Sequence, residues 1–195
     1  YRGYDIINMK KIQMSTNAPT FPYPPKPEQG TVSRLDPSEF AFETKGNVTR
    51  GMLHRPSNLM ISRHGKPLDT SPYQEAIDML PEDDDQWEWV DLGLWGSPRT
   101  PGFNEGVMMV IDLPAMPMNQ YRHRNMEIRH NLPCDIELPF SKAFRPAVVY
   151  CHETLQCMKE RIEHINKSAG LVVWEGFVGK RLTSTYPWNT QHPGG

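Results

Sequence analysis

Residues 40–50 read Phe-Ala-Phe-Glu-Thr-Lys-Gly-Asn-Val-Thr-Arg. Phe40 and Phe42 alternate with smaller and polar residues, and this period of two predicts a strand that runs into Lys45. A lysine at a strand end, partly desolvated and beside other cations, can lose its proton near neutral pH and attack an electrophile. Arg50 could then hold a phosphate or a ribose. The same pattern is also typical of an ordinary solvated turn.

A second charged stretch, residues 174–181, reads Trp-Glu-Gly-Phe-Val-Gly-Lys-Arg. Glu175, Lys180 and Arg181 stand in a strand that is otherwise apolar. Charges in such a place are costly unless they meet partners, and a magnesium ion or a polyphosphate would be such a partner. An edge strand whose charges face water is the alternative interpretation.

Short strands separated by turns fill the chain from Ser38 onward. The pattern predicts strands over residues 40–45, 52–54, 59–61, 87–92, 107–113, 147–150 and 171–178. It predicts a first helix that begins at Ser71, with Gln74 completing a capping box, and ends at Pro81. It predicts a second helix over about 119–130 and a third over about 152–168, which Gly170 ends. Many strands with few helices, not in strict alternation, predict an α+β fold with largely antiparallel sheets and flanking helices.

Residues 1–37 have a different composition. Five prolines between positions 19 and 27 exclude a helix or a central strand there and indicate a polyproline II arm, which tethers the domain or lies across it. We therefore expect an N-terminal extension over residues 1–37 and one domain over residues 38–195. The chain opens with Tyr1 and stops at Gly195, so we expect a fragment of a longer product, or missing ends.

The overall composition restricts the class of protein. The 195 residues include 21 Lys plus Arg and 23 Asp plus Glu, a net charge of -2. This balance argues against a broadly basic nucleic-acid coat but leaves room for a local positive patch. No apolar run approaches the length of a membrane span, and the first ten residues lack a signal sequence, so we expect a cytoplasmic protein without a membrane partner.

Cysteine and histidine placement indicates neither a disulfide framework nor a zinc site. The three cysteines form no Cys-x-x-Cys pair and have no zinc-like spacing to the histidines. We expect them to be reduced, with Cys151 and Cys157 packing in the interior.

Taken together and in order, these stretches resemble the nucleotidyltransferase (adenylation) domain of ATP-dependent polynucleotide ligases, in the covalent nucleotidyltransferase superfamily. Motif I of that family, Lys-x-Asp-Gly-x-Arg, corresponds to residues 45–50, with Asn and Val where Asp and Gly are usual. Motif IV corresponds to residues 175–180. The turn at residues 62–66 resembles the family's Arg-x-Gly turn, residues 90–94 resemble motif III without its usual glutamate, and residues 107–112 resemble motif IIIa.

The resemblance implies a ligase-type nucleotidyltransferase (ATP-grasp-like) domain that uses ATP and Mg²⁺. Lys45 would be the catalytic nucleophile, forming a lysine–AMP phosphoamide, and Glu175 would bind the magnesium ion. The nucleotide-binding residues would be Thr44, Arg50, Arg63, Asp91, Ile111, Glu175 and Lys180. Ile111 stands where an aromatic residue often stacks on the base. The AMP would pass to the 5′-phosphate of a nick in a nucleic acid. DNA is expected in preference to RNA, which implies a role in DNA repair and replication.

Two parts of the family pattern are not found in the sequence. Motif V, a Lys-x-Lys strand, and the OB-fold domain that follows it are both missing. The resemblance therefore implies an adenylation domain that stops before motif V. An RNA ligase of the same superfamily is one alternative, and a non-catalytic scaffold or binding protein with a ligase-like fold is another.

Overall fold

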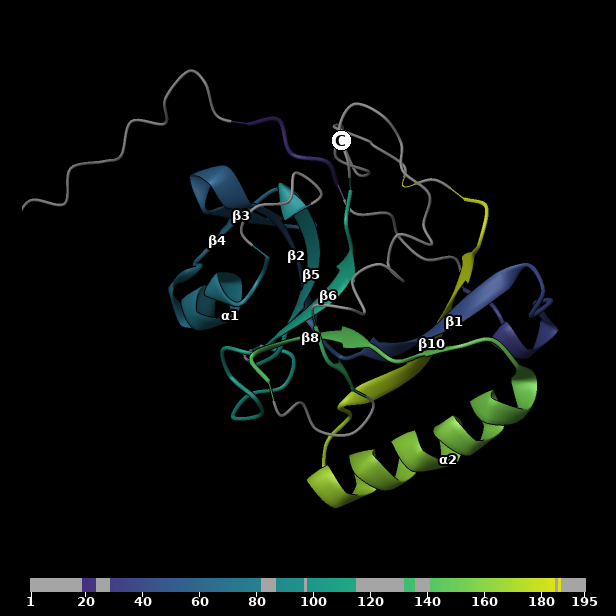
Figure 1. Ribbon diagram of the computed structural model, residues 1–195. Coiled ribbons are helices and arrows are strands. Elements are labelled where there is room, and N and C mark those ends of the chain that lie inside the picture. Colours follow the sequence, from purple (N-terminus) through teal and green to yellow (C-terminus); the bar gives the residue numbers. More distant parts are fainter. Residues whose placement is uncertain are drawn as a thin grey trace, which may run out of the picture.

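The computed structural model describes residues 19–23, 29–81, 87–96, 98–114, 132–135, 141–184 and 186. Its main elements are two β-sheets and one long helix (Figure 1). The helix expected over residues 119–130 lies outside the described residues. Among the described residues, no helix combines the length and the apolar character that crossing a membrane requires.

The smaller sheet has β1 (Phe40–Gly46) in the middle, between β10 (Trp174–Arg181) and β9 (Val148–Val149), with both neighbours antiparallel. Helix α2 (His152–Ala169) runs along the outer side of the β1–β10 pair (Figure 1). Phe42 packs there against Leu155 and Met158 of the helix. Because strand residues alternate between faces, Glu43 and Lys45 point the other way, toward the larger sheet.

The larger sheet has seven strands in the order β4-β3-β2-β5-β6-β8-β7. Their bounds are Pro67–Leu68 (β4), Leu59–Ser62 (β3), Thr49–His54 (β2), Trp89–Leu94 (β5), Met108–Asp112 (β6), Ala143–Pro146 (β8) and Cys134–Asp135 (β7). The pairs β6–β8 and β7–β8 are parallel, and the other pairs are antiparallel. The predicted α+β class with largely antiparallel sheets is confirmed.

The two faces of the larger sheet differ in chemistry. Leu53 of β2 and Val90 and Leu92 of β5 share one face and belong to an apolar core with Ala76 and Ile77 of α1 (Gln74–Asp78). The opposite face carries Arg50 of β2 and Asp91 of β5. This polar face is the one that positions the candidate site.

The first predicted helix is shorter and less regular than expected. The 3₁₀ turns η1 (Val32–Arg34), η2 (Arg55–Ser57) and η3 (Ser71–Tyr73) accompany the helices, and η3 leads directly into α1. The expected capping box is wrong, because neither η3 nor α1 has a side-chain cap. Gln74 instead accepts a hydrogen bond from Asn58 and donates one to Asp78.

Helix α2 matches its prediction closely. Leu155, Met158 and Ile162 are buried along one side, and Gly170, at φ 67°, caps the C-terminal end. The expected packing of Cys151 and Cys157 is wrong, because both are free and exposed. Cys151 is the N-cap residue, before the first helical turn, so the apolar stripe of the helix does not include it.

Candidate nucleotidyl-transfer site

Lys45 and Glu175, the predicted nucleophile and the predicted magnesium ligand, form an ion pair. Nζ of Lys45 lies 2.7 Å from Oε2 of Glu175, and the two side chains are 40% and 31% exposed. The pair is therefore accessible to a substrate from solvent.

A β-bulge places Glu175 beside Lys45. Lys45 pairs with Gly176 and Gly46 pairs with Trp174, so Glu175 is the extra residue on β10. In a regular ladder, Glu175 would face away from Lys45, because neighbouring residues of a strand point to opposite faces. Bulges commonly redirect a side chain beside a functional site, and this one brings the carboxylate to the lysine.

Lys180 connects the two sheets. Its Nζ lies 2.8 Å from Oε2 of Glu43 and 3.5 Å from Oδ2 of Asp112, and it donates a 2.6 Å hydrogen bond to the carbonyl oxygen of Ile111. Ile111 is itself the extra residue of a second bulge, because Asp91 pairs with Asp112 while Leu92 pairs with Val110. The Lys180 side chain is 10% exposed, and carboxylates of the protein balance its positive charge.

Arg50 is held by Asp91 on the polar face of the larger sheet. Nε of Arg50 donates to Oδ1 of Asp91 over 2.6 Å, and Nη2 forms an ion pair with Oδ2. The Asp91 side chain is fully buried, whereas that of Arg50 is 21% exposed. Burial alone would lower the pKa of Arg50, but the attraction of Asp91 outweighs it and raises the pKa above its ordinary value.

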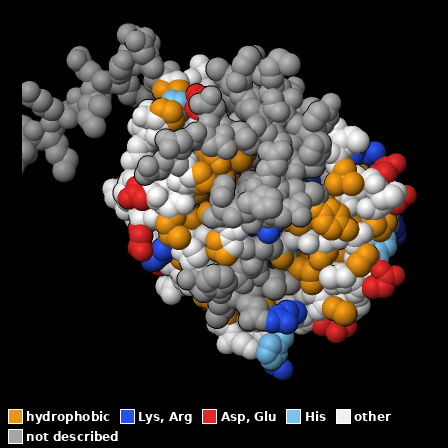
Figure 2. Space-filling model, in the orientation of Figure 1, with side chains coloured by type: hydrophobic (Ala, Val, Ile, Leu, Met, Phe, Trp, Pro, Cys, Tyr) orange, Lys and Arg blue, Asp and Glu red, His pale blue; other side chains and the backbone are white. Residues whose placement is uncertain are grey.

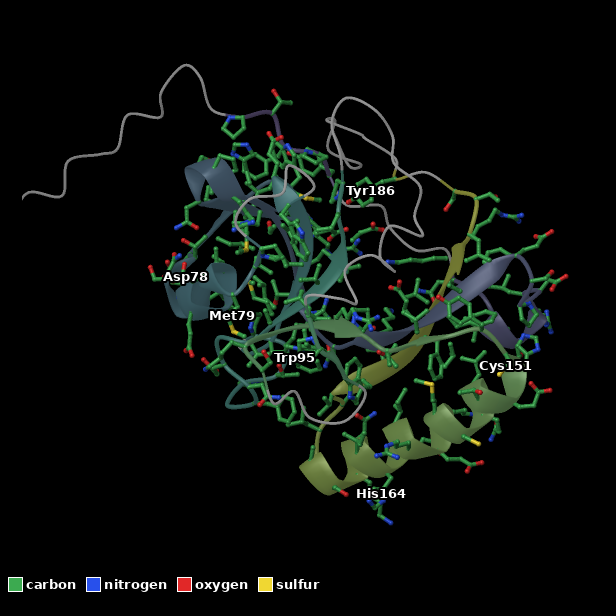
Figure 3. All side chains as sticks on the ribbon, in the orientation of Figure 1. Asp78, Met79, Trp95, Cys151, His164 and Tyr186 are labelled. Carbon is green, nitrogen blue, oxygen red and sulfur yellow. The ribbon has the colours of Figure 1, made fainter. Side chains whose placement is uncertain are left out.

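Tyr186 completes this group from the segment after β10. Its hydroxyl donates a 2.9 Å hydrogen bond to Oδ2 of Asp91, and it lies near the end of β6 (Figure 3). Burial, together with the charge of Asp91, raises the pKa of Tyr186 well above its usual value, so the hydroxyl stays a donor. Asp91, which the resemblance assigns to the nucleotide, thus binds both Arg50 and Tyr186 in this structure.

The other predicted nucleotide-binding residues lie in three different settings. Thr44 is 2% exposed, and its hydroxyl accepts a hydrogen bond from the backbone amide of Ala147, so its side chain does not face the Lys45–Glu175 pair. Ile111 is half-buried in the bulge described above. Arg63 is exposed in the turn between β3 and β4, with Nε donating to Nε2 of His64 over 3.0 Å.

The two unusual residues of motif I have structural roles. The amide nitrogen of Asn47 donates to the carbonyl of Val173, and its Nδ2 donates to the carbonyl of Val172, which fixes the end of β1 to the turn after α2. Val48 packs on Gly93, where an added Cβ would lie 2.6 Å from Cγ2 of Val48. The glycine at position 93 therefore leaves the space that the side chain of Val48 occupies.

Three buried residues that bind Lys180 or Asp91 were not predicted from the sequence to be site residues: Glu43, Asp112 and Tyr186. Glu43 and Asp112 are charged residues in apolar strands, and a search for charges at core positions would have found them. Nothing in the sequence indicated that the Tyr186 hydroxyl would reach β5.

Charge on the visible surface is mixed. Figure 2 shows basic and acidic side chains interspersed over the face it presents, so the described residues of that face form no single basic patch. This agrees with the net charge of -2.

Comparison with known proteins places this geometry in a known fold. No protein-family model and no curated protein matches the sequence. Among solved structures, a Lig E DNA ligase has a TM-score of 0.52 at 13% identity, over 84% of this chain and 63% of that chain. The ligase domain of LigD from M. tuberculosis has a TM-score of 0.55 at 18% identity, over 86% and 57% of the two chains.

A third match, a mycobacterial DNA ligase D complexed with ATP and MES, has a TM-score of 0.54 at 18% identity and covers 86% of this chain and 56% of that chain. The chain thus spans 56% to 63% of the length of these three structures. At this level of identity the likeness concerns the fold. The chain has the fold of the ATP-dependent DNA ligases' nucleotidyltransferase domain.

Proposed function

We propose that this chain is the adenylation domain of an ATP-dependent DNA ligase and that Lys45 is its nucleophile. The observation that carries the proposal is the Lys45–Glu175 pair, in which a bulge brings a lysine and a carboxylate within 2.7 Å in a ligase fold. The match to a DNA ligase complexed with ATP supports ATP as the substrate. The catalytic unit is residues 38–195, with residues 1–37 as an N-terminal extension.

The first reaction forms a bond between Nζ of Lys45 and the α-phosphorus of ATP. The Lys45 ammonium of the ion pair releases one proton to solvent to become the attacking amine, and a second proton once the new bond has formed. The bond from the α-phosphorus to the bridging oxygen breaks, and pyrophosphate leaves with that electron pair. The product is a lysine–AMP phosphoamide. Because negative charge is concentrated on the phosphate oxygens, the reaction requires cations that are in place beforehand.

Arg50 is suited to supply such a cation. Asp91 binds Nε and Nη2 on one side of the guanidinium, and within the described part of the chain Nη1 has no hydrogen bond, so it would be the nitrogen that contacts a ribose or phosphate oxygen. The bidentate contact also fixes the plane of the guanidinium before substrate arrives. Lys180 adds positive charge between the sheets, although Glu43 and Asp112 balance it.

The donor set fits magnesium with one protein ligand. Among the described residues, no group of three Asp, Glu, His or Cys side chains could hold a metal ion. Mg²⁺ in phosphoryl-transfer sites usually binds one or two carboxylates and completes its shell with waters and substrate phosphates. Glu175, with its exposed carboxylate, would be that ligand. A bound Mg²⁺ would neutralise charge on the triphosphate.

The later reactions require a nicked nucleic acid. AMP would move from Lys45 to the 5′-phosphate, and the neighbouring 3′-hydroxyl would then displace it and seal the nick. DNA is the proposed substrate because the matched solved structures are DNA ligases.

The test of the first step is incubation with ATP labelled at the α-phosphate and Mg²⁺, followed by a denaturing gel. Wild-type protein should retain label, and Lys45→Ala should not. Lys142→Ala is the matched control, because Lys142 is similarly exposed and forms a longer ion pair, 3.9 Å, with Glu75. Loss of label in both variants would argue against a specific role for Lys45.

A non-catalytic nucleotide-binding protein with this fold is the second candidate. The observation that favours it is the use of Lys180 inside the protein, where two carboxylates and a carbonyl hold it. An ATP-dependent rise in melting temperature without covalent label would support this candidate. Sealing assays on nicked DNA and nicked RNA, carried out on labelled protein, would distinguish a DNA ligase from an RNA ligase.

A further inference from the structure

Residues 19–23, which we term the N-terminal strap, lie against the larger sheet. The ring of Phe21 meets that of Trp89 edge-on at 5.1 Å, and Pro22 is buried. Phe21 also packs on the cluster formed by Met52, Trp89 and Tyr186. The strap is therefore part of the packed structure.

The strap covers the polar face of the sheet, which also carries Arg50. Met52 pairs with Asp91 on one side and with Ile61 on the other, so these three side chains share a face. Arg50 lies two residues before Met52 and therefore has the same orientation. Phe21 and Ile61 both pack against the cluster that contains Met52 of this face.

Tyr23 extends the strap to the turn that carries Arg63. An added Cβ on Gly65 would lie 2.6 Å from the Tyr23 hydroxyl oxygen and 3.4 Å from two of its ring carbons. Tyr23 thus packs directly on the backbone of the turn. Within the turn, Oγ of Ser62 accepts hydrogen bonds from the amides of His64 and Lys66, each at 3.2 Å.

The turn begins beside Arg50. Ser62 pairs with Gly51, the residue after Arg50, so Arg63 follows the last paired position at the same end of the hairpin. Ile61 shares the face of Met52 and Arg50, and Arg63 follows two residues later, in the turn, with its Nε donating to Nε2 of His64. Binding a ligand to an exposed arginine on a turn costs conformational entropy, because the side chain and the turn become ordered. A turn that is already fixed lowers this cost.

We propose that the N-terminal strap, through Tyr23, holds the turn at residues 62–66 and so positions Arg63 toward the phosphate or ribose of the nucleotide. Tyr23 is a positioning residue, because it acts through the turn and touches no substrate. The part of this proposal that concerns the nucleotide rests on the proposed function. The part that concerns the turn stands on the contacts alone.

Hydrogen exchange measured by mass spectrometry tests the contact without any substrate. In Tyr23→Ala, amides of residues 62–66 should exchange several-fold faster than in wild type, while those of α2 should not change. Equal exchange in the turn would overturn the proposal.

Glycine substitutions give a matched test if Tyr23→Ala folds poorly. Gly65 and Gly102 have nearly the same φ, 71° and 72°, but nothing lies within 4 Å of an added Cβ at Gly102. Both alanine variants carry the backbone strain, so Gly65→Ala should lower the melting temperature more than Gly102→Ala. Tyr23→Phe should partly rescue Gly65→Ala, because it removes the atom at 2.6 Å. Equal losses and no rescue would overturn the proposal.

Kinetics of lysine adenylation test the link to Arg63. Arg63→Ala should raise the KM for ATP by about tenfold, with the rate at saturating ATP changed much less. Tyr23→Ala should raise KM in the same direction, and the double variant should be no worse than Arg63→Ala. Additive effects, or an unchanged KM in Tyr23→Ala, would overturn the proposal. A wild-type protein that forms no adenylate would instead contradict the proposed function and leave the exchange and melting results as the test of the strap.

Discussion

Tyr186 and Asp91 are joined by a 2.9 Å hydrogen bond, and both side chains are buried. Asp91 lies in β5 of the larger sheet, whereas Tyr186 follows β10 of the smaller one. The same carboxylate holds Arg50, so one buried aspartate connects the segment after motif IV to the arginine of motif I. The C-terminal part of the described chain thereby stabilises a cation of the candidate site.

Removal of Asp91 should cost more stability than removal of the Tyr186 hydroxyl. Asp91→Ala leaves a largely buried guanidinium without its partner, and breaking a buried ion pair costs about 3–5 kcal/mol. Tyr186→Phe removes one hydrogen bond to a charged group, worth about 1.5–3 kcal/mol. Urea unfolding measures both free energies. A loss in Asp91→Ala no greater than that in Tyr186→Phe would contradict the arrangement.

Tyr186 should also give the protein a specific sensitivity to alkali. Because its pKa in the folded state is raised, its contribution to stability is present below about pH 10, the value for an unfolded tyrosine, and is lost as the pH rises toward the folded-state pKa. The stability advantage of wild type over Tyr186→Phe should therefore be constant up to about pH 10 and shrink above it. Tyr73, whose pKa is also raised, is present in both proteins and serves as the internal reference. An advantage that grows with pH would be the opposite of this expectation.

Replacement of Lys180 should destabilise the junction of the two sheets. Lys180→Met would leave the buried carboxylates of Glu43 and Asp112 without the ammonium between them. The expected loss is about 3–5 kcal/mol at neutral pH. Lys142→Met, at an exposed pair with Glu75, should cost no more than about 1 kcal/mol. Chemical denaturation of both variants would show whether the two lysines differ in this way.

The strands that carry the site could be predicted from the sequence. Alternation around Phe42 predicted β1, and the apolar run around Phe177 predicted most of β10, because both are regular short-range patterns. The chemistry of Lys45 and Glu175 was predicted from motif resemblance. Their 2.7 Å contact depends on a bulge, and the sequence contains no periodicity that locates a bulge.

The partners of the buried charged residues could not be predicted, because they depend on contacts between distant segments. Glu43 lies on the side of β1 that faces the larger sheet, and Lys180 reaches across to β6. The alternation within β1 does not reveal that both faces of this strand are covered. For the same reason, the sequence did not indicate that Arg50 and Tyr186 would both bind the carboxylate of Asp91.

The central claim is that Lys45 becomes covalently adenylated, and the most direct measurement is the mass of the intact protein after incubation with ATP and Mg²⁺. We expect wild-type protein to gain the mass of one adenylyl group, peptide mapping to place it on Lys45, and Lys45→Arg, which keeps the positive charge beside Glu175, to gain none. No mass gain in wild type, or the same gain in Lys45→Arg, would contradict the claim.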